Sequence, residues 1–372
     1  MTFTLNKINA GGNTIGAVAI ASPFVSVFNE QQHFGYLDGS GRIWDSWYNP
    51  SRNSWNLQQI NAGGRTQGPT AVAGPSIGVY QNQQHFAYLD GKGAIWDSWY
   101  DGSKNVWNLQ QLNLGGRTSG PAAKPGVQGK ELGPVSVWVD PSNSQQHFTY
   151  LGTDSAVYDA FWDSNANQWK LQKISVGGVT NGPPAASSPI GCIYHSQQHI
   201  AYLDSAGNIN DSWYDGSGHW SLQRIGGLSA VPNQPFSWVD PTDTQQHFTY
   251  LGPDSAVYDA YWDSNKNSWQ EQKINVGGNT QGPAAKGLPN ACVFGKEEHF
   301  GYLDGVGNIW DSFRDSAGSW HLQQVNSGPA AVDVVFLWTS ITTGNQLHFT
   351  YRDVTGFIWD SAFTEASTTP SA

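Results

Sequence analysis

The stretch QQHFGYLDGSGRIWDSWY, residues 31 to 48, decides the fold because the chain repeats it. It returns at residues 83 to 100 as QQHFAYLDGKGAIWDSWY and at residues 145 to 162 as QQHFTYLGTDSAVYDAFW. Seven copies, spaced 48 to 62 residues apart, each carry a histidine and, twelve positions later, an aspartate. The histidines are His33, His85, His147, His199, His247, His299 and His348, and the aspartates are Asp45, Asp97, Asp159, Asp211, Asp259, Asp311 and Asp360. A period near 50 residues is typical of propellers and solenoids.

The pattern within each copy predicts four short strands. QQHFGYLD and GRIWDSWY are rich in aromatic and β-branched residues, and the DGSG between them predicts a tight hairpin. The runs PFVSVFN (23 to 29) and SWNLQQIN (54 to 61) add a strand before and a strand after this hairpin. Four antiparallel strands repeated seven times predict an all-β, seven-bladed β-propeller, with residues 1 to 372 as a single domain and residues 364 to 372 as a short C-terminal tail.

The two ends of the chain predict how the ring closes. The seventh copy ends in TEASTTPSA and has no fourth strand, whereas FTLNKINAGGNTIG (3 to 16) matches WNLQQINAGGRTQG (55 to 68) with Phe3 in the place of Trp55. We therefore expect residues 3 to 9 to form the outer strand of the last blade, which removes an exposed sheet edge.

Composition excludes several classes of protein. Charged and aromatic residues are each 13% of the chain, there are 18 Trp, and the net charge is −11. Such a charge argues against binding to nucleic acid or to an anionic membrane surface, both of which attract Lys and Arg clusters. No apolar run reaches membrane-spanning length, so no membrane insertion is expected. No signal peptide is recognisable, so we expect synthesis in the cytoplasm. Any action on host glycans would then require release by a non-classical route.

The two cysteines, Cys192 and Cys292, are expected to be free thiols. They lie 100 residues apart at equivalent positions of non-neighbouring copies, and a disulfide requires Cα atoms within about 7 Å. A metal site would need more cysteines at a closer spacing, so neither a metal nor a cofactor is expected.

The repeated histidine and aspartate have two interpretations. They resemble a general-base pair, but an active site is needed once and this pair occurs seven times. Strand parity places His33 and Asp45 on the same face of a blade, where a hydrogen bond would satisfy two buried polar groups. We interpret the pairs as structural and predict no catalytic residue.

Function is expected where the copies differ or where aromatic residues exceed what packing needs. The ends of the third strands vary (DSWYN, DSWYD, DAFWD, DSWYD, DAYWD, DSFRD, DSAFT), and loops such as GGRTQGP follow the outer strands. Aromatic plates beside hydrogen-bonding groups suit the two faces of a sugar. The candidate carbohydrate-binding residues are Trp44, Trp47, Tyr48, Arg65, Thr66, Trp96, Trp99, Tyr100, Arg117, Thr118, Trp213 and Tyr214. For each tryptophan the alternative is a place in the packing between blades.

The repeats, the W-x-L-Q-x-I-N-x-G-G segment and the N-terminal closing strand resemble the PLL-type ("bangle") lectins of Photorhabdus bacteria over the whole chain. The resemblance implies a seven-bladed propeller that binds L-fucose and O-methylated sugars without calcium, between neighbouring blades. It also implies homo-oligomers and a role in contact between bacterium and host. Asn210 replaces a tryptophan, and the loops GGLSAVPNQP and NSGP depart from the pattern, so fewer than seven working sites are expected.

Two other classes of function remain open. A propeller can be a scaffold for protein–protein interaction, which predicts no sugar binding. D-G-x-G-x-I-W is similar to the Asp-box hairpin of sialidases, but the seven Arg and six Glu are scattered and no paired acidic centre is visible. A glycosidase is therefore the weaker alternative.

Overall fold

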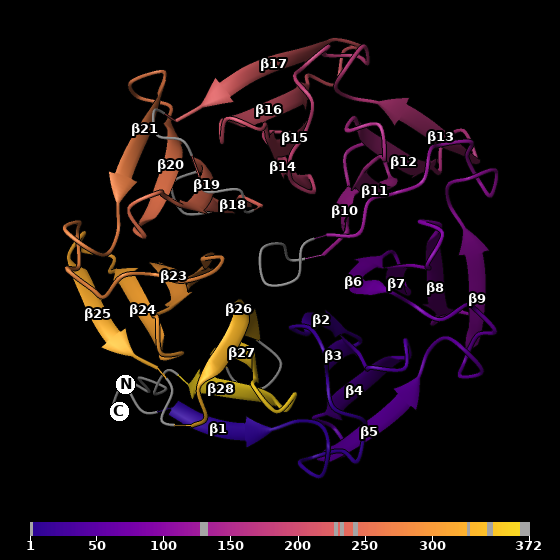
Figure 1. Cartoon of the computed structure of the whole chain (residues 1–372), viewed down its shortest axis with the longest axis horizontal. Helices are drawn as coiled ribbons and strands as arrows, with labels where there is room; N and C mark the ends of the chain where they lie inside the picture. Colours follow the sequence, from indigo (N-terminus) through magenta and orange to yellow (C-terminus); the bar gives the residue numbers. More distant parts are fainter. Residues whose placement is uncertain are drawn as a thin grey trace, which may run out of the picture.

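The computed structural model describes residues 3–126, 133–226, 230, 234–240, 245–325, 328–340 and 345–364. The regular elements in this part of the chain are 28 strands, which form seven separate four-stranded antiparallel sheets. The sheets stand as blades around a central opening, and the first strand (Phe3–Lys7) lies beside the last strand (Ile358–Thr364) in the outer part of the ring (Figure 1). The prediction of a seven-bladed propeller is confirmed. The described residues contain no helix long and apolar enough to cross a membrane.

In every blade the four strands follow one another from the central opening to the outer edge of the ring. Blade 1 contains β2 (Phe24–Phe28), β3 (Gln31–Leu37), β4 (Ile43–Asn49) and β5 (Ser54–Gln59), and blade 2 contains β6 (Ala73–Tyr80), β7 (Gln83–Leu89), β8 (Ile95–Asp101) and β9 (Val106–Gln111). Blade 3 contains β10 (Val135–Asp140), β11 (Gln145–Leu151), β12 (Val157–Asp163) and β13 (Gln168–Lys173), and blade 4 contains β14 (Ile190–Tyr194), β15 (Gln197–Leu203), β16 (Ile209–Tyr214) and β17 (Trp220–Ile225). Blade 5 contains β18 (Phe236–Asp240), β19 (Gln245–Leu251), β20 (Val257–Asp263) and β21 (Ser268–Lys273), and blade 6 contains β22 (Asn290–Phe294), β23 (Glu297–Leu303), β24 (Ile309–Arg314) and β25 (Trp320–Gln324). Blade 7 contains β26 (Ala331–Ser340), β27 (Gln346–Asp353), β28 (Ile358–Thr364) and β1 (Phe3–Lys7).

The N-terminal strand closes the ring as expected. β1 pairs with β28 from Phe3 opposite Phe363 to Lys7 opposite Trp359, so the two ends of the chain share blade 7 (Figure 1). The strand is two residues shorter than the expected residues 3 to 9, and Ile8 and Asn9 continue the contact through hydrogen bonds with the backbone of Ile358. Residues 365 to 372 of the expected tail lie outside the described part.

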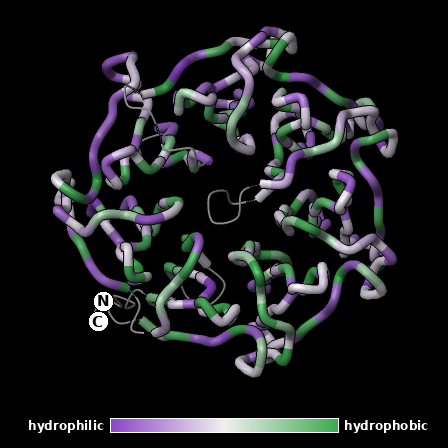
Figure 2. The backbone as a smooth tube through the Cα atoms, in the orientation of Figure 1, coloured by the Kyte–Doolittle hydropathy of each residue, from purple (hydrophilic) through white to green (hydrophobic). Residues whose placement is uncertain are grey.

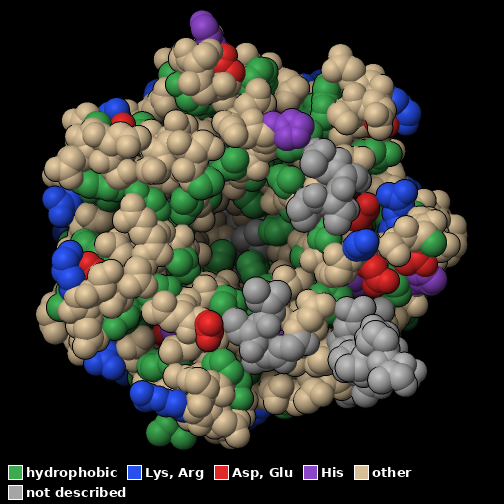
Figure 3. Space-filling view, turned by 180° about the vertical axis from the view of Figure 1, so that it is seen from behind, with side chains coloured by type: hydrophobic (Ala, Val, Ile, Leu, Met, Phe, Trp, Pro, Cys, Tyr) green, Lys and Arg blue, Asp and Glu red, His purple; other side chains and the backbone are tan. Residues whose placement is uncertain are grey.

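The core lies between the blades rather than within one of them. The blade sheets alternate hydrophilic and hydrophobic residues along the chain (Figure 2), and hydrophobic side chains gather around the central opening (Figure 3). Seven buried clusters combine side chains from adjacent blades, with Phe34, Phe86, Phe148, Phe248 and Phe300 fully buried. We call each contact between adjacent blades a seam and name it by its two blades.

The G-G-x-T-x-G loop belongs to the seam. Thr66 Oγ1 bonds the carbonyl of Ile60 and the hydroxyl of Ser98 in the next blade, both at 3.0 Å. A Cβ on Gly68 would lie 2.0 Å from the hydroxyl of Tyr88, so only glycine permits this approach. The loop therefore links one blade to the next.

The hairpin between the second and third strands is held by its aspartate. Asp38 Oδ1 accepts the backbone N–H groups of Ser40 and Arg42 at 2.8 and 3.0 Å, and Oδ2 accepts the indole N–H of Trp44 at 2.9 Å. The same contacts recur around Asp90, where Trp96 is the indole donor. Trp44 and Trp96 are thus part of the framework of their hairpins.

Candidate functional site

All seven repeat histidines are hydrogen-bonded to their aspartates. The closest distances from Nδ1 to a carboxylate oxygen run from 2.8 to 3.0 Å, and every pair is buried. An imidazole Nδ1–H that donates to a carboxylate pairs two buried polar atoms inside a seam. The expected hydrogen bond within each pair is confirmed.

Flat aromatic side chains enclose these histidines in two ways. In blades 3, 5 and 7 an inner-strand tryptophan stacks on the imidazole, with centroids 3.8 to 3.9 Å apart. In blades 1, 2 and 4 the third-strand tryptophans Trp47, Trp99 and Trp213 stack at 5.8 to 6.2 Å. These three candidates therefore cover the histidine of their own blade.

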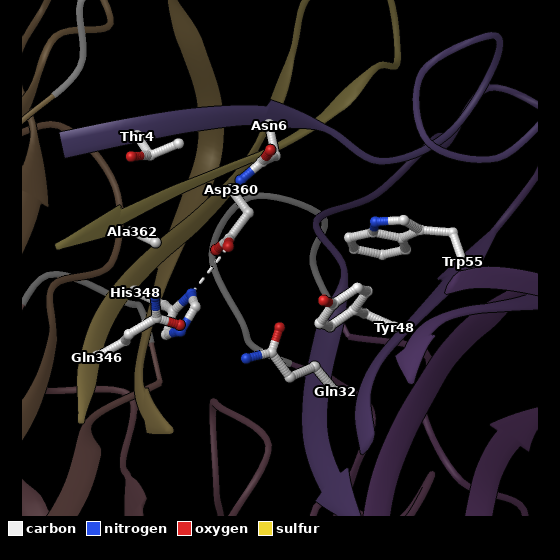
Figure 4. Close-up of a pocket in the computed structure, with 9 residues that line it drawn as sticks. All are labelled: Thr4, Asn6, Gln32, Tyr48, Trp55, Gln346, His348, Asp360 and Ala362. Atoms are coloured by element: carbon white, nitrogen blue, oxygen red, sulfur yellow. Dashed lines mark hydrogen bonds and ion pairs between the residues drawn. The ribbon is translucent and has the colours of Figure 1, made fainter. Parts of the chain in front are cut away.

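A pocket of about 390 Å³ opens in the 7/1 seam. Blade 7 lines it from β1, β27 and β28, and blade 1 lines it from β3, β4 and β5 (Figure 4). Its lining residues are Thr4, Asn6, Gln32, Tyr48, Trp55, Gln346, His348, Asp360 and Ala362. Tyr48 is the one predicted site residue among them.

The two walls of the pocket differ in chemistry. On the blade 1 side, Tyr48 and Trp55 lie together with ring centroids 5.4 Å apart and face across the pocket (Figure 4). The opposite wall is polar: the carboxylate of Asp360, hydrogen-bonded to His348 at 2.8 Å, lies beside Asn6. The pocket thus offers an aromatic plate on one side and hydrogen-bonding groups on the other.

The pocket lies nearer one rim of the ring, and the loops that carry the predicted arginine and threonine residues lie at the opposite rim. Gln32, Tyr48 and Trp55 adjoin the turns at residues 29–30 and 50–53, at one rim of the ring. Arg65 and Thr66 follow the opposite end of β5, at the rim that also bears the hairpin of residues 38 to 42. The strands of a blade place these two sets at opposite ends, so Arg65 and Thr66 do not line this pocket.

Thr66 and Thr118 are corrected in particular. Both were expected to project toward a ligand, but both are buried, and their hydroxyls bond backbone carbonyls at 3.0 and 2.7 Å. The loop geometry turns each side chain into the seam.

Arg65 and Arg117 are exposed but tethered to their own blades. Arg65 Nε donates to Gln58 at 2.8 Å, and Gln58 in turn donates to Asp45 at 3.0 Å. The arrangement repeats from Arg117 through Gln110 to Asp97. These arginines extend the hydrogen-bond network of the histidine–aspartate pairs to the surface.

Tyr100 and Tyr214 occupy the positions of Tyr48 in blades 2 and 4. Their ring centroids lie 5.6 and 5.5 Å from those of Trp107 and Trp220, an arrangement like that of Tyr48 and Trp55. The aromatic wall is therefore repeated at the 1/2 and 3/4 seams.

Sequence reasoning missed Trp55 and the polar wall. Trp55 was assigned to the outer strand, and the histidine–aspartate pair was treated as wholly structural, although at this seam it also faces the pocket. A signal was present in the third-strand tail DSAFT, where Ala362 replaces the aromatic residue of the other copies.

Comparison with known proteins supports the fold. The chain is similar to the BP39L lectin of Burkholderia pseudomallei, with 17% identity, a TM-score of 0.67, and coverage of 94% of this chain and 97% of that one. It is also similar to a mutant of AofleA from Arthrobotrys oligospora (10% identity, TM-score 0.55, coverage 88% and 90%) and to a fucose-specific lectin from Aleuria aurantia (16%, 0.50, 77% and 88%). No family model and no curated protein matches the sequence. At these identities the likeness establishes the propeller fold, and membership of the PLL-type family stays a prediction.

Proposed function

We propose that this protein is a carbohydrate-binding lectin whose sites lie in the seams between blades. The observation that carries the proposal is the 7/1 pocket, where Tyr48 and Trp55 face Asn6, Asp360 and other polar groups. The apolar C–H face of a sugar ring stacks on aromatic side chains, while its hydroxyls take hydrogen bonds from the polar wall. The names of the structural neighbours, two of which are described as lectins, support the same class.

The ligands we expect are L-fucose and O-methylated or related sugars on glycoproteins. The fucose-specific neighbour and the resemblance noted in the sequence support this choice. We also propose homo-oligomers, release by a non-classical route and a role at the surface of a host.

Each site should bind weakly. A shallow seam contacts only part of a monosaccharide, so we expect a dissociation constant of about 0.1 to 1 mM per site. Several sites on one ring, engaged with one glycosylated surface, would gain about 10²- to 10⁴-fold through effective concentration.

The pocket is poorly equipped for hydrolysis. Glycosidases generally use two carboxyl groups, and Asp360 is the one carboxylic acid among the described residues of the lining. Its oxygens already accept hydrogen bonds from His348 and Thr350 at 2.8 and 2.7 Å. A general acid at this position would have to be a protonated carboxyl group that can donate its proton to the leaving group.

A glycan array combined with a hydrolysis assay tests the proposal. Binding to fucosylated or O-methylated glycans without product formation is expected. Product formation would favour the glycosidase, and an array without any bound glycan would favour a scaffold for protein–protein interaction. Tight binding of one sugar per chain, with no gain on a fucosylated surface, would contradict multivalency.

A further inference from the structure

Blade 7 departs from the other six at one position. Two residues after the histidine-bonded aspartate, and opposite the histidine in the strand register, each of the other blades has an aromatic side chain. These are Trp47, Trp99, Phe161, Trp213, Tyr261 and Phe313. In blade 7 the residue opposite His348 is Ala362.

The aromatic rings at this position stack on their histidines. Ring centroids lie 5.1 to 6.2 Å apart, with interplanar angles of 10 to 24°. Blades 3 and 5 have an inner tryptophan as well, so His147 is sandwiched between Trp138 and Phe161. Blade 7 has one half of this sandwich: Trp338 stacks on His348 at 3.8 Å, and Ala362 leaves the other side open.

A second shortened side chain enlarges the same space. In blades 1, 2, 4, 5 and 6 an outer-strand glutamine donates to the aspartate of the pair at 2.9 to 3.2 Å. Blade 7 has Asn6 opposite Asp360, one methylene shorter, and it makes no hydrogen bond to that carboxylate. Ala362 and Asn6 both line the pocket, beside His348 and Asp360 (Figure 4).

We propose that the 7/1 pocket takes a sugar that bears a planar aromatic substituent. The substituent occupies the place of the missing side chain beside the His348 imidazole, and the sugar ring lies against Tyr48 and Trp55. This rests on the proposed function and adds a ligand class to one of its seams.

The open space beside the His348 imidazole favours an aromatic group over a polar one. His348 donates its Nδ1–H to Asp360, so the imidazole is held in one orientation and presents its face. Offset parallel stacking of two flat rings is favourable beyond the burial of area alone. The methyl group of Ala362 adds an apolar floor, and the chain itself places Phe or Tyr in the equivalent space of blades 3 and 5.

The test compares phenyl α-L-fucoside with methyl α-L-fucoside by isothermal titration. The wild-type protein should bind the phenyl glycoside about 10-fold more tightly at one site per chain, since burying a ring adds apolar contact. Ala362→Phe should abolish this preference while leaving binding of the methyl glycoside at other seams. Phenylalanine at this position is compatible with the fold, because Phe161 occupies it in a blade of the same type.

A matched variant should create the same open space beside a histidine at another seam. Phe161→Ala should open the equivalent space at the 3/4 seam, where Tyr214 and Trp220 repeat the aromatic wall, and add a second site that prefers the phenyl glycoside. Melting temperatures of both variants check that they are folded. Equal affinity for the two fucosides, or a preference that survives Ala362→Phe, would overturn this inference alone. Binding of neither fucoside would overturn it together with the proposed function.

Discussion

The two faces of blade 7 form seams of opposite character. On one face, Thr4, Asn6, Gln346, His348 and Asp360 line the pocket of the 7/1 seam. On the other face, side chains of the same strands pack into the apolar cluster of the 6/7 seam. They are Phe3, Leu5, Leu347, Phe349 and Phe363. Alternation along a strand sends neighbouring residues to opposite faces, so one blade can seal one seam and open the next.

The residue directly before the repeat histidine differs between the open 7/1 seam and the apolar 6/7 seam. Gln32 donates to Ser340 across the 7/1 seam at 3.2 Å, and Gln198 donates to Asp140 across the 3/4 seam at 2.7 Å. Blade 7 has Leu347 at this position, packed in the same cluster as Cys292. The 6/7 seam therefore lacks the polar arm that its counterparts have, and we expect it to bind no sugar.

Removal of β1, which contributes side chains to both faces of blade 7, should have the largest effect on stability. Deletion of residues 1 to 10 exposes the edge of β28 and removes Phe3 and Leu5 from the apolar cluster. We expect a loss of about 5 kcal/mol or more in the free energy of unfolding, with aggregation, as measured by thermal melting and light scattering.

Point substitutions in β1 separate its two faces. Leu5→Ala should lower stability, whereas Asn6→Ala should leave stability nearly unchanged and alter ligand binding. A deletion variant with an unchanged melting temperature would refute closure by the N-terminal strand.

Substitution of a histidine–aspartate pair should have different effects where aromatic rings cover the imidazole and at the open 7/1 seam. His147 is buried between Trp138 and Phe161 and bonded to Asp159 at 2.8 Å. His147→Ala or Asp159→Ala leaves a buried partner unsatisfied, and we expect a loss of about 1 to 3 kcal/mol in chemical denaturation.

The matching variant at the pocket is His348→Ala. It should cost similar stability and also weaken binding of the phenyl fucoside, whereas His147→Ala should retain that binding. Loss of sugar binding at full stability in the His147 variant would contradict the structural role of the covered pairs.

The 5/6 seam has a charged side chain at the position that directly precedes the repeat histidine. Glu298 stands where Gln32 stands in blade 1, and one of its oxygens accepts a hydrogen bond from Arg314 at 3.2 Å. Burial, opposed by His247 and Arg314 and assisted by Asp259 and Asp240, raises the pKa of the Glu298 carboxyl from 4.5 to about 7. The folded chain therefore holds a proton that the unfolded chain has released between these two pH values.

A raised carboxyl pKa predicts that stability falls as the pH rises from about 4.5 to about 7. Glu298→Gln should remove this part of the slope and stabilise the protein at pH 8 by about 1 to 2 kcal/mol, since the glutamine buries no charge. Denaturation curves at pH 5 and pH 8 measure the difference. Glu30→Gln, at an exposed turn, is the control; an equal slope in both variants would exclude Glu298 as its source.

The threonines that link the blades should give the smallest effect. Thr66 bonds Ser98 across the 1/2 seam, whereas blade 3 has Ala160 at the position of Ser98 and offers Thr118 no such partner. Thr66→Val should therefore cost about 0.5 to 1 kcal/mol more than Thr118→Val in denaturation experiments. Equal costs would show that the bond between blades contributes nothing beyond the bond to the carbonyl.

The thiols are free, as the sequence predicted. Cys192 accepts a hydrogen bond from Ser237 across the 4/5 seam at 2.9 Å, and burial raises the pKa of its thiol to about 12. The two cysteines are half-buried in separate seams, which keeps them apart.

The sequence by itself determined the fold of this protein. The twelve-residue interval between histidine and aspartate, the hairpin turns and the match of residues 3 to 16 with residues 55 to 68 are local or periodic features, and each is readable without coordinates. They were sufficient for seven blades, for closure by the N-terminal strand and for the hydrogen bonds of the pairs.

Only the tertiary structure decided where the site lies. A seam is formed by two blades, so its lining combines residues as distant as Trp55 and Asp360, and no local pattern reports that they meet. Strand direction also decides which rim a residue adjoins, and it separates Arg65 from the wall formed by Tyr48 and Trp55. The alanine at position 362 was visible in the sequence, but its consequence, an open space beside a histidine, depends on the blade that faces it.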